Sequence, residues 1–167
     1  MKRMGLSAEW TNSGCLLARN QCSFKKLIWV LSCIQNIQFL LMENFTQAIT
    51  FKIERRHFSW FCSAIYASPN PAAIKLLWNQ LRDISHLCTG PWLMLGAFNE
   101  ILGPQEVSGG TFSMSRALTF ANMIDKCNML EIEMKGGRFT WRKNIQNGIH
   151  VRKKLDRCLS NPDWRMH

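Results

Sequence analysis

The spacing of apolar residues changes in the middle of the chain, from strand-like to helical. From Phe58 to Tyr66, apolar side chains occupy both sets of alternating positions, which predicts a strand covered on both faces. The strand is predicted to end at the turn 68–71, because this segment contains two prolines. An amphipathic helix is then predicted to begin near Pro71 and to end before Gly90. Its apolar face consists of Ile74, Leu77, Trp78, Leu81 and Ile84.

The second half of the chain predicts further strands and a second helix. A short apolar run over 92–95 gives the order strand, helix, strand. The polar, glycine-rich segment 103–115 is predicted to be a loop. A strand is expected at 139–141, and the pair Asn147-Gly148 predicts a hairpin turn with 149–159 as the returning strand. The second helix is predicted from the helical spacing of Leu118, Ala121, Ile124 and Cys127.

The N-terminal part of the chain is rich in β-prone apolar residues. The run 27–42 is too short and too polar to span a bilayer comfortably, so it is predicted to form buried strands and no membrane partner is expected. We divide the chain into an N-terminal segment of apolar strands, 1–50, and a domain, 51–167. The predicted fold class is α/β (α+β), with a substantial sheet.

Composition narrows the function classes. The length of 167 residues predicts one domain, and 47% hydrophobic with 19% charged residues argues against a disordered polar chain. There are 21 Lys and Arg against 11 Asp and Glu, a net charge of +10, and the excess lies towards the two ends. A basic surface attracts polyanions, so nucleic acid is the first partner to consider. A basic surface that only keeps the protein soluble explains the charge equally well.

The seven cysteines form no Cys-x-x-Cys pair and have no histidines at matching spacing. A structural zinc site is therefore not predicted, and no disulfide partner is expected. We expect the cysteines to be small, buried side chains with free thiols, as in a reducing compartment.

The segment Gly96-Ala97-Phe98-Asn99 follows a predicted buried strand, at the kind of strand end where ligands collect in α/β sheets. Here the sequence resembles the endonuclease/exonuclease/phosphatase superfamily, and most closely the endonuclease domain of plant LINE-type retrotransposons, whose signature at this place is Gly-Asp-Phe-Asn. Further family motifs follow in the same order and are matched by Tyr66-Ala67-Ser68-Pro69, by Glu106 with Ser108-Gly109-Gly110, by Phe139-Thr140-Trp141, by Leu155-Asp156-Arg157, and by Asn161 with Asp163-Trp164.

The resemblance implies a fold of two packed sheets flanked by helices, here partial and with outer strands missing. It also implies Mg²⁺-dependent hydrolysis of phosphodiesters, as in DNA nicking. By match to the motifs, Asn99 would be the amide that holds the catalytic aspartate and the phosphate, and Tyr66 would be a phenolic donor to the phosphate. Asp156 would be the acid that orients a catalytic histidine.

The sequence departs from the family pattern at the residues that matter most for catalysis. Ala97 stands where the family has the aspartate, and a methyl group can neither bind Mg²⁺ nor accept a proton. The family's glutamate motif and its Ser-Asp-His motif are absent from the sequence. We therefore predict a truncated, catalytically inactive copy without metal ligands, in which the family's Mg²⁺ is not expected to bind.

The same residues also have structural interpretations. Tyr66 can be a core aromatic residue at a strand end, and Asn99 can be a turn amide. Asp156 can be an exposed acid that pairs with Arg157 or Lys154.

A basic stretch near the C-terminal end is interleaved with Phe139 and Trp141, as in a nucleic-acid platform, although such stretches are more often solvated hairpin faces. We predict weak, salt-sensitive binding of DNA or RNA. The alternative is a relic without a selected function. The candidate binding residues are Arg138, Arg142, Lys143, Arg152, Lys153, Lys154 and Arg157.

Overall fold

The computed structural model describes residues 8–10, 15–18, 28–31, 37–144 and 150–166. The helices are α1 (Pro71–Ser85), α2 (Met114–Lys126) and α3 (Pro162–Arg165), and η1 (Pro104–Glu106) is a 3-10 turn. The strands are β1 (Ala8–Trp10), β2 (Cys15–Ala18), β3 (Ile28–Leu31), β4 (Gln38–Asn44), β5 (Ala48–Arg55), β6 (Phe58–Tyr66), β7 (Trp92–Ala97), β8 (Val107–Ser108), β9 (Leu130–Glu131), β10 (Trp141–Asn144), β11 (His150–Lys153) and β12 (Asp156–Ser160).

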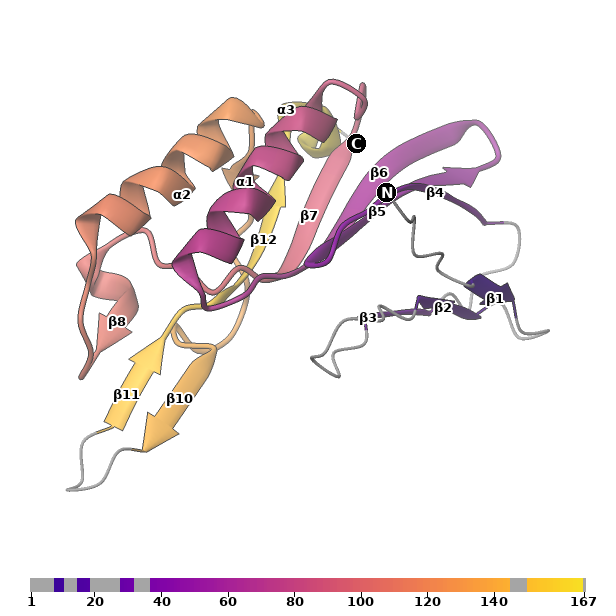
Figure 1. The fold of residues 1–167 in the computed structure, drawn as a ribbon. Helices are drawn as coiled ribbons and strands as arrows, with labels where there is room; N and C mark the ends of the chain where they lie inside the picture. The colour runs from indigo at the N-terminus through magenta and orange to yellow at the C-terminus, as the bar shows by residue number, and fades with distance from the viewer. Residues whose placement is uncertain (1–7, 11–14, 19–27, 32–36, 145–149, 167) are drawn as a thin grey trace.

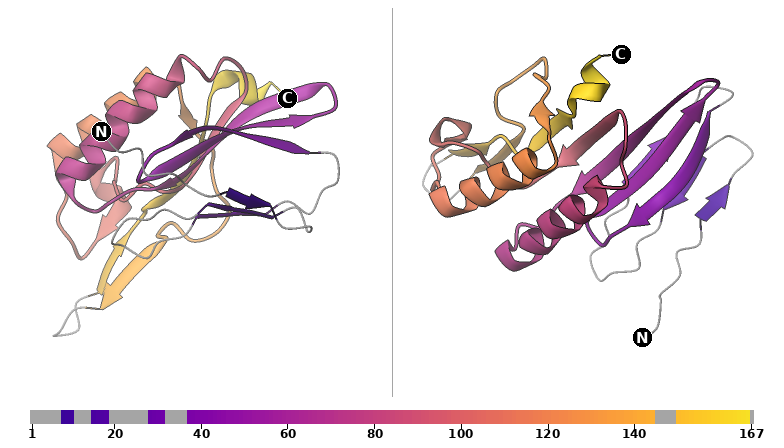
Figure 2. Two further views of the ribbon diagram at one scale, coloured as in Figure 1. Left: turned by 45° about the vertical axis from the view of Figure 1, so that its right-hand side comes forward. Right: turned by 90° about the horizontal axis from the view of Figure 1, so that it is seen from above.

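A six-stranded sheet with the order β4-β5-β6-β7-β12-β9 forms the centre of the molecule. Its strands pair antiparallel except for β6 and β7, which run parallel because α1 connects them as a crossover. Helices α1 and α2 lie side by side on one face of this sheet, and the small sheet β1-β2-β3 lies on the other side of the β4–β6 end (Figure 1, Figure 2). The strands β10, β11 and β8 form a third sheet that extends from the start of β12. The mixed α/β class predicted from the sequence is confirmed.

The main core lies between the six-stranded sheet and the two long helices. Leu77 and Leu81 of α1 have no exposed surface, and the ring of Trp78 stacks on that of Phe120 with the centroids 4.9 Å apart. Ser63 links two strands inside this core, because its hydroxyl accepts a hydrogen bond of 2.9 Å from the indole N–H of Trp92. This hydrogen bond therefore holds β6 and β7 together beneath the two helices.

Helix α1 begins where the sequence predicts. The side chain of Asn70 accepts hydrogen bonds from the backbone N–H groups of Ala72 and Ala73, at 2.9 and 3.3 Å, and Pro71 occupies the first helical position, where its missing N–H costs nothing. Helix α2 is also confirmed, but its predicted face is wrong by about one residue. Leu118 is 62% exposed, and the buried residues of α2 are Ala117, Phe120 and Met123.

Two predictions about strands are wrong. The predicted returning strand 149–159 is two strands in different sheets, because the chain leaves β11, which pairs with β10 and β8, and enters β12, which pairs with β7 and β9. The turn pair Asn147-Gly148 lies outside the described residues. In the run 27–42 the structure does contain β3 and most of β4, but β4 is an edge strand and exposes Leu40, Leu41 and Met42. The division between residues 50 and 51 falls within β5.

Among the helices formed by described residues, none is both long and apolar enough to cross a membrane.

Four cysteines have described side chains, and all four are free thiols. Burial raises the pKa of Cys62 to about 11 and that of Cys88 and Cys127 to about 12, and it raises the pKa of Cys158 as well. These thiols are therefore un-ionised at neutral pH. Cys88 and Cys127 are buried, as predicted, whereas Cys62 and Cys158 are half-buried.

Candidate active site and basic hairpin

Three of the sequence-predicted positions meet in one row across the six-stranded sheet. Tyr66, the last residue of β6, lies opposite Ala97, the last residue of β7, and Ala97 lies opposite Asp156, the first residue of β12. Directly opposed residues in a sheet point to the same face. The adjacent residues Ile65 and Arg157 are buried on the helical side, so the row faces away from α1 and α2. Tyr66 is 39% exposed there, which places it at the surface and not in the core.

The turn after β7 depends on a glycine and an asparagine. Gly96 has φ of +132°, and a Cβ at this position would lie 2.1 Å from the carbonyl oxygen of Ile65, so a side chain cannot fit without moving the backbone of β6. Asn99 has φ of +52°, a left-handed conformation that Asn tolerates better than most residues. Its amide nitrogen donates to the carbonyl of Ala67, and the N–H of Ala67 donates to the carbonyl of Ala97 at 2.8 Å. Asn99 therefore ties the end of β6 to the turn after β7.

Ala97 is the centre of the row, because it pairs with Tyr66 on one side and with Asp156 on the other, so a methyl group occupies the middle position. A magnesium ion prefers several oxygen ligands, usually with one or two carboxylates. The row offers one carboxylate, and no group of three His, Cys, Asp or Glu side chains among the described residues could hold a metal ion. The described residues of this row therefore do not fit the Mg²⁺ that the sequence resemblance implies.

Asp156 is held by its backbone at the junction between two sheets. The hydroxyl of Thr140 accepts hydrogen bonds from the N–H groups of Leu155 and Asp156, at 2.9 and 3.0 Å. The alternative that Asp156 pairs with Arg157 or Lys154 is not supported, because these two side chains pair with Glu106 and Glu131 instead.

The segments 138–144 and 150–153, here called the basic hairpin, form an exposed arm beside this row. All four residues of β10 are exposed, and β11 joins β12 through Lys154 and Leu155 (Figure 1). The guanidinium groups of Arg138 and Arg152 lie over the ring of Phe139, at 5.8 and 5.1 Å from its centroid. Of the seven predicted binding residues, the five that lie on this exposed arm are Arg138, Arg142, Lys143, Arg152 and Lys153.

Arg157 is a correction to the predicted binding set. Its side chain is fully buried, because it points to the helical face of β12, and its Nη1 atom lies 3.0 Å from Glu106 Oε1 and 2.9 Å from Glu131 Oε1. Lys154 joins the same group, with Nζ 2.8 Å from Glu131. This cluster of two cations and two carboxylates was not predicted from the sequence, although Glu106 belongs to one of the matched family motifs.

The charge of Glu106 is stabilised inside this group. Burial by itself raises the pKa of the carboxyl, but the side-chain hydrogen bond from Arg157, the N–H of Leu102 and the charges of Arg157 and Lys154 together outweigh burial and lower the pKa below its usual 4.5. Glu106 is therefore ionised at neutral pH.

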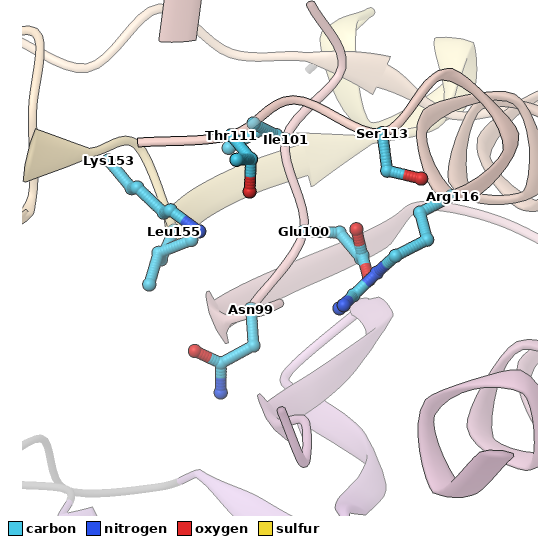
Figure 3. Close-up of a pocket in the computed structure, with 8 residues that line it drawn as sticks. All are labelled: Asn99, Glu100, Ile101, Thr111, Ser113, Arg116, Lys153 and Leu155. Carbon is cyan, nitrogen blue, oxygen red and sulfur yellow. The ribbon is translucent and has the colours of Figure 1, made fainter. Parts of the chain in front are cut away.

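A pocket of about 100 Å³ opens between the turn after β7, the loop before α2 and the end of β11 (Figure 3). Its walls consist of Asn99, Glu100, Ile101, Thr111, Ser113, Arg116, Lys153 and Leu155. Glu100 is buried and accepts a hydrogen bond of 2.6 Å from Nε of Arg116. None of these contacts was predicted from the sequence, because they join three segments that are distant along the chain.

The structure is similar to the endonuclease domain of TRAS1, a telomere-specific non-LTR retrotransposon, with a TM-score of 0.63 at 12% identity. The match covers 93% of this chain and 65% of that domain, so the chain spans less than two thirds of the neighbour's length. Beta toxin from Staphylococcus aureus matches with a TM-score of 0.47 at 15% identity, over 70% of this chain and 43% of the toxin. A variant of that toxin with bound magnesium ions matches with a TM-score of 0.48 at 17% identity, over 70% and 42% of the two chains.

The similarity to the TRAS1 domain shows that this chain has the fold of that endonuclease domain, which is the kind of fold that the sequence resemblance implied. No protein-family model matches the sequence, and no curated protein matches it either.

Proposed function

We propose that this chain is an endonuclease domain of the non-LTR retrotransposon kind, related to those of plant LINE elements, that no longer hydrolyses phosphodiesters. The observation that carries the proposal is the position of Ala97, between Tyr66 and Asp156 in one row of the sheet. The frame of the turn is kept by Gly96 and Asn99, whereas the central side chain is a methyl group.

The missing carboxylate removes the group that would position and deprotonate an attacking water. Loss of a positioned general base lowers the rate about 10² to 10⁴-fold, and loss of a negative ligand also weakens the site for a divalent cation. The carboxylate of Asp156 does not replace the missing one. Asp156 is the first residue of the neighbouring strand, so its side chain leaves the sheet beside position 97 and cannot occupy the place of the side chain at 97.

The test is nicking of supercoiled plasmid DNA by the purified chain in the presence of Mg²⁺ or Mn²⁺. We expect no nicking above a protein-free control, even at high protein concentration. The variant Ala97→Asp is expected to stay inactive, because it adds one carboxylate and supplies no proton-transfer partner. Ala97→Asn is the matched control, since it has the same shape without the charge. Metal-dependent nicking by the unaltered chain would refute the proposal, and rescue by Ala97→Asp alone would show that the remaining site is complete.

A second candidate function, non-catalytic binding of nucleic acid, is supported by the basic hairpin. The guanidinium groups of two arginines there lie over the ring of Phe139, and Trp141 of the same hairpin is 37% exposed. Cations that follow a backbone and aromatic rings that stack on bases are the two features of single-strand binding surfaces.

This function is tested by fluorescence anisotropy with labelled single-stranded and double-stranded DNA at several salt concentrations. The double variant Arg142→Gln/Lys143→Gln is expected to bind more weakly and to lower the slope of log K against log salt by roughly 0.7 to 0.9 per lost phosphate contact. Lys75→Gln/Arg82→Gln is the matched control, because it removes two cations from α1, away from the hairpin. Equal affinities for the two double variants would refute binding by the hairpin.

A further inference from the structure

Strand β4 gives the six-stranded sheet an exposed, apolar edge. Among the described strands only β5 pairs with β4, so the other side of the β4 backbone has no strand beside it. Figure 1 shows β4 at the end of the sheet that is remote from α2. Leu40, Leu41 and Met42 are 47%, 49% and 37% exposed. An edge of this kind presents a row of N–H and C=O groups that pairs readily with another strand.

The features that normally prevent edge pairing are scarce in β4. Natural edge strands are shielded by lysines, prolines, bulges or a very short length. β4 has seven residues, which is longer than the average strand, and it contains no Lys, Arg or Pro. One bulge interrupts its pairing with β5, between Leu41 and Glu43. Residues 38–41 precede this bulge and pair with β5 in regular register, so the first half of the edge is open to a further strand.

The charge of β4 favours a protein strand over a polyanion. The chain has a net charge of +10, but Glu43 is the one charged residue of β4. Lys52, on the neighbouring strand β5, is already paired with Glu54 at 2.6 Å. β4 itself therefore offers no cation to a nucleic acid, whereas it offers backbone donors and acceptors and exposed apolar side chains to a strand.

The residue order of β4 suits antiparallel pairing with a second copy of the same strand. When two copies are related by a two-fold axis at position 41, apolar residues meet near the axis and polar residues meet at the ends. Glu43 meets an aromatic residue and not its own copy, so no like charges are opposed. The opposed pairs are Leu41 with Leu41, Leu40 with Met42, Phe39 with Glu43, and Gln38 with Asn44.

We propose that β4 pairs antiparallel with β4 of a second copy of this chain, about a two-fold axis at Leu41, and joins two six-stranded sheets into one. A two-fold contact uses the same edge on both subunits, so it closes at the dimer. One strand edge buries less than the roughly 800 Å² per partner of stable interfaces, so the dimer is weak, with a dissociation constant in the micromolar range. The inference is independent of nucleic-acid binding and goes beyond the functions proposed above.

The experiment is sedimentation velocity of the full chain, freed of nucleic acid, from low micromolar to millimolar concentration and at low and high salt. We expect an equilibrium between monomer and dimer. Added salt should strengthen the dimer, because it screens the repulsion between two chains that each carry a charge of +10. Dimers bridged by residual nucleic acid would instead weaken with salt, and this result would overturn the inference.

Substitution of Leu41 tests the position of the axis. Leu41→Lys and Leu41→Glu each place two like charges opposite each other, so each variant alone should dimerise at least about tenfold more weakly. An equimolar mixture of the two variants should regain the dimer, because Lys then meets Glu, and this recovery also shows that both variants fold. Leu118→Lys is the matched control, since it changes a leucine of α2 that is 62% exposed, and it should dimerise like the unaltered chain.

Hydrogen exchange of the unaltered chain gives a second measurement that needs no variant. The amides of residues 39–41 should exchange more slowly at high than at low protein concentration. Exchange that does not depend on concentration, or a monomer at every concentration, would overturn the inference and leave this edge for a strand of another protein. Oligomers that grow beyond the dimer, an equal loss of association in Leu118→Lys, or a mixture of folded Leu41 variants that stays monomeric would each overturn it as well.

Discussion

The group of charges around Arg157 gives the sharpest test of what holds this fold together. The Arg157 side chain is fully buried and contacts both Glu106 and Glu131, so it connects η1 and β9 to β12. The variant Arg157→Met keeps much of the side-chain volume but removes the charge. Two carboxylates then share one cation, Lys154, whose Nζ lies 2.8 Å from Glu131 but 3.8 Å from Glu106.

The expected loss in the free energy of unfolding follows from the burial of Glu106, the carboxylate that remains without its arginine partner. Removal of one member of a buried ion pair costs about 3 to 5 kcal/mol, because the other charge stays buried without compensation. Glu106 fits this case, since its side chain is only 9% exposed. Small domains have free energies of unfolding of about 5 to 15 kcal/mol, so the variant should be marginally stable.

The assay is urea unfolding followed by tryptophan fluorescence at pH 7. Arg152→Met is the matched control, because it removes an exposed arginine from the neighbouring strand and should cost no more than about 1 kcal/mol. The double variant Arg157→Met/Glu106→Gln should recover part of the loss, because the stranded charge is gone. A loss below about 1 kcal/mol for Arg157→Met, or no recovery in the double variant, would refute the reasoning. Arg157→Lys, which keeps the charge, gives a second measurement if Arg157→Met does not fold.

The remaining predictions test acid stability, a turn and the core. Folding lowers the pKa of Glu106 from its unfolded value of 4.5. The ionised carboxylate therefore stabilises the fold above pH 4.5, and this stabilisation is lost as the pH falls through the lower pKa of the folded chain. Urea unfolding from pH 7 to pH 3 should show this loss of stability, and Glu106→Gln should lack it. Gly96→Ala should destabilise by more than about 2 kcal/mol in the same assay, because its Cβ would lie 2.1 Å from the carbonyl oxygen of Ile65; an unchanged midpoint would contradict the close approach. Ser63→Ala should cost about 1 to 3 kcal/mol, because the buried N–H of Trp92 loses its acceptor, and a loss below about 0.5 kcal/mol would show that this hydrogen bond is replaced.

Much of the candidate site could be predicted from the order of motifs. The motifs placed Tyr66, Ala97, Asn99 and Asp156 at strand ends, and the register of the sheet brings three of them into one row. The role of Asn99 as a tie to Ala67 was open, since a turn amide and a phosphate ligand have the same sequence signal. Its contact with the neighbouring strand could only come from the structure.

The charged residues show the limit of sequence reasoning most clearly. Arg157 has the same local sequence context as its basic neighbours, but it is fully buried while Arg152 is exposed. The cause is that β12 belongs to the central sheet and turns Arg157 to its helical face, where Glu106 and Glu131 bind it. The sequence predicted one returning strand over 149–159 and counted Arg157 among the binding residues, because nothing in the local pattern showed that a buried pair of carboxylates would meet it.

The sequence by itself determined the class of the fold, the long helices, the central strands and the methyl side chain at position 97. These features depend on local periodicity, on turn residues and on one side chain's chemistry. The tertiary structure alone decided which charges are buried and which line the pocket beside Lys153. The burial and the pairing of these charges depend on contacts between segments that are far apart along the chain, such as the contact of Glu106 in η1 with Arg157 in β12. Local sequence patterns carry no information about such contacts.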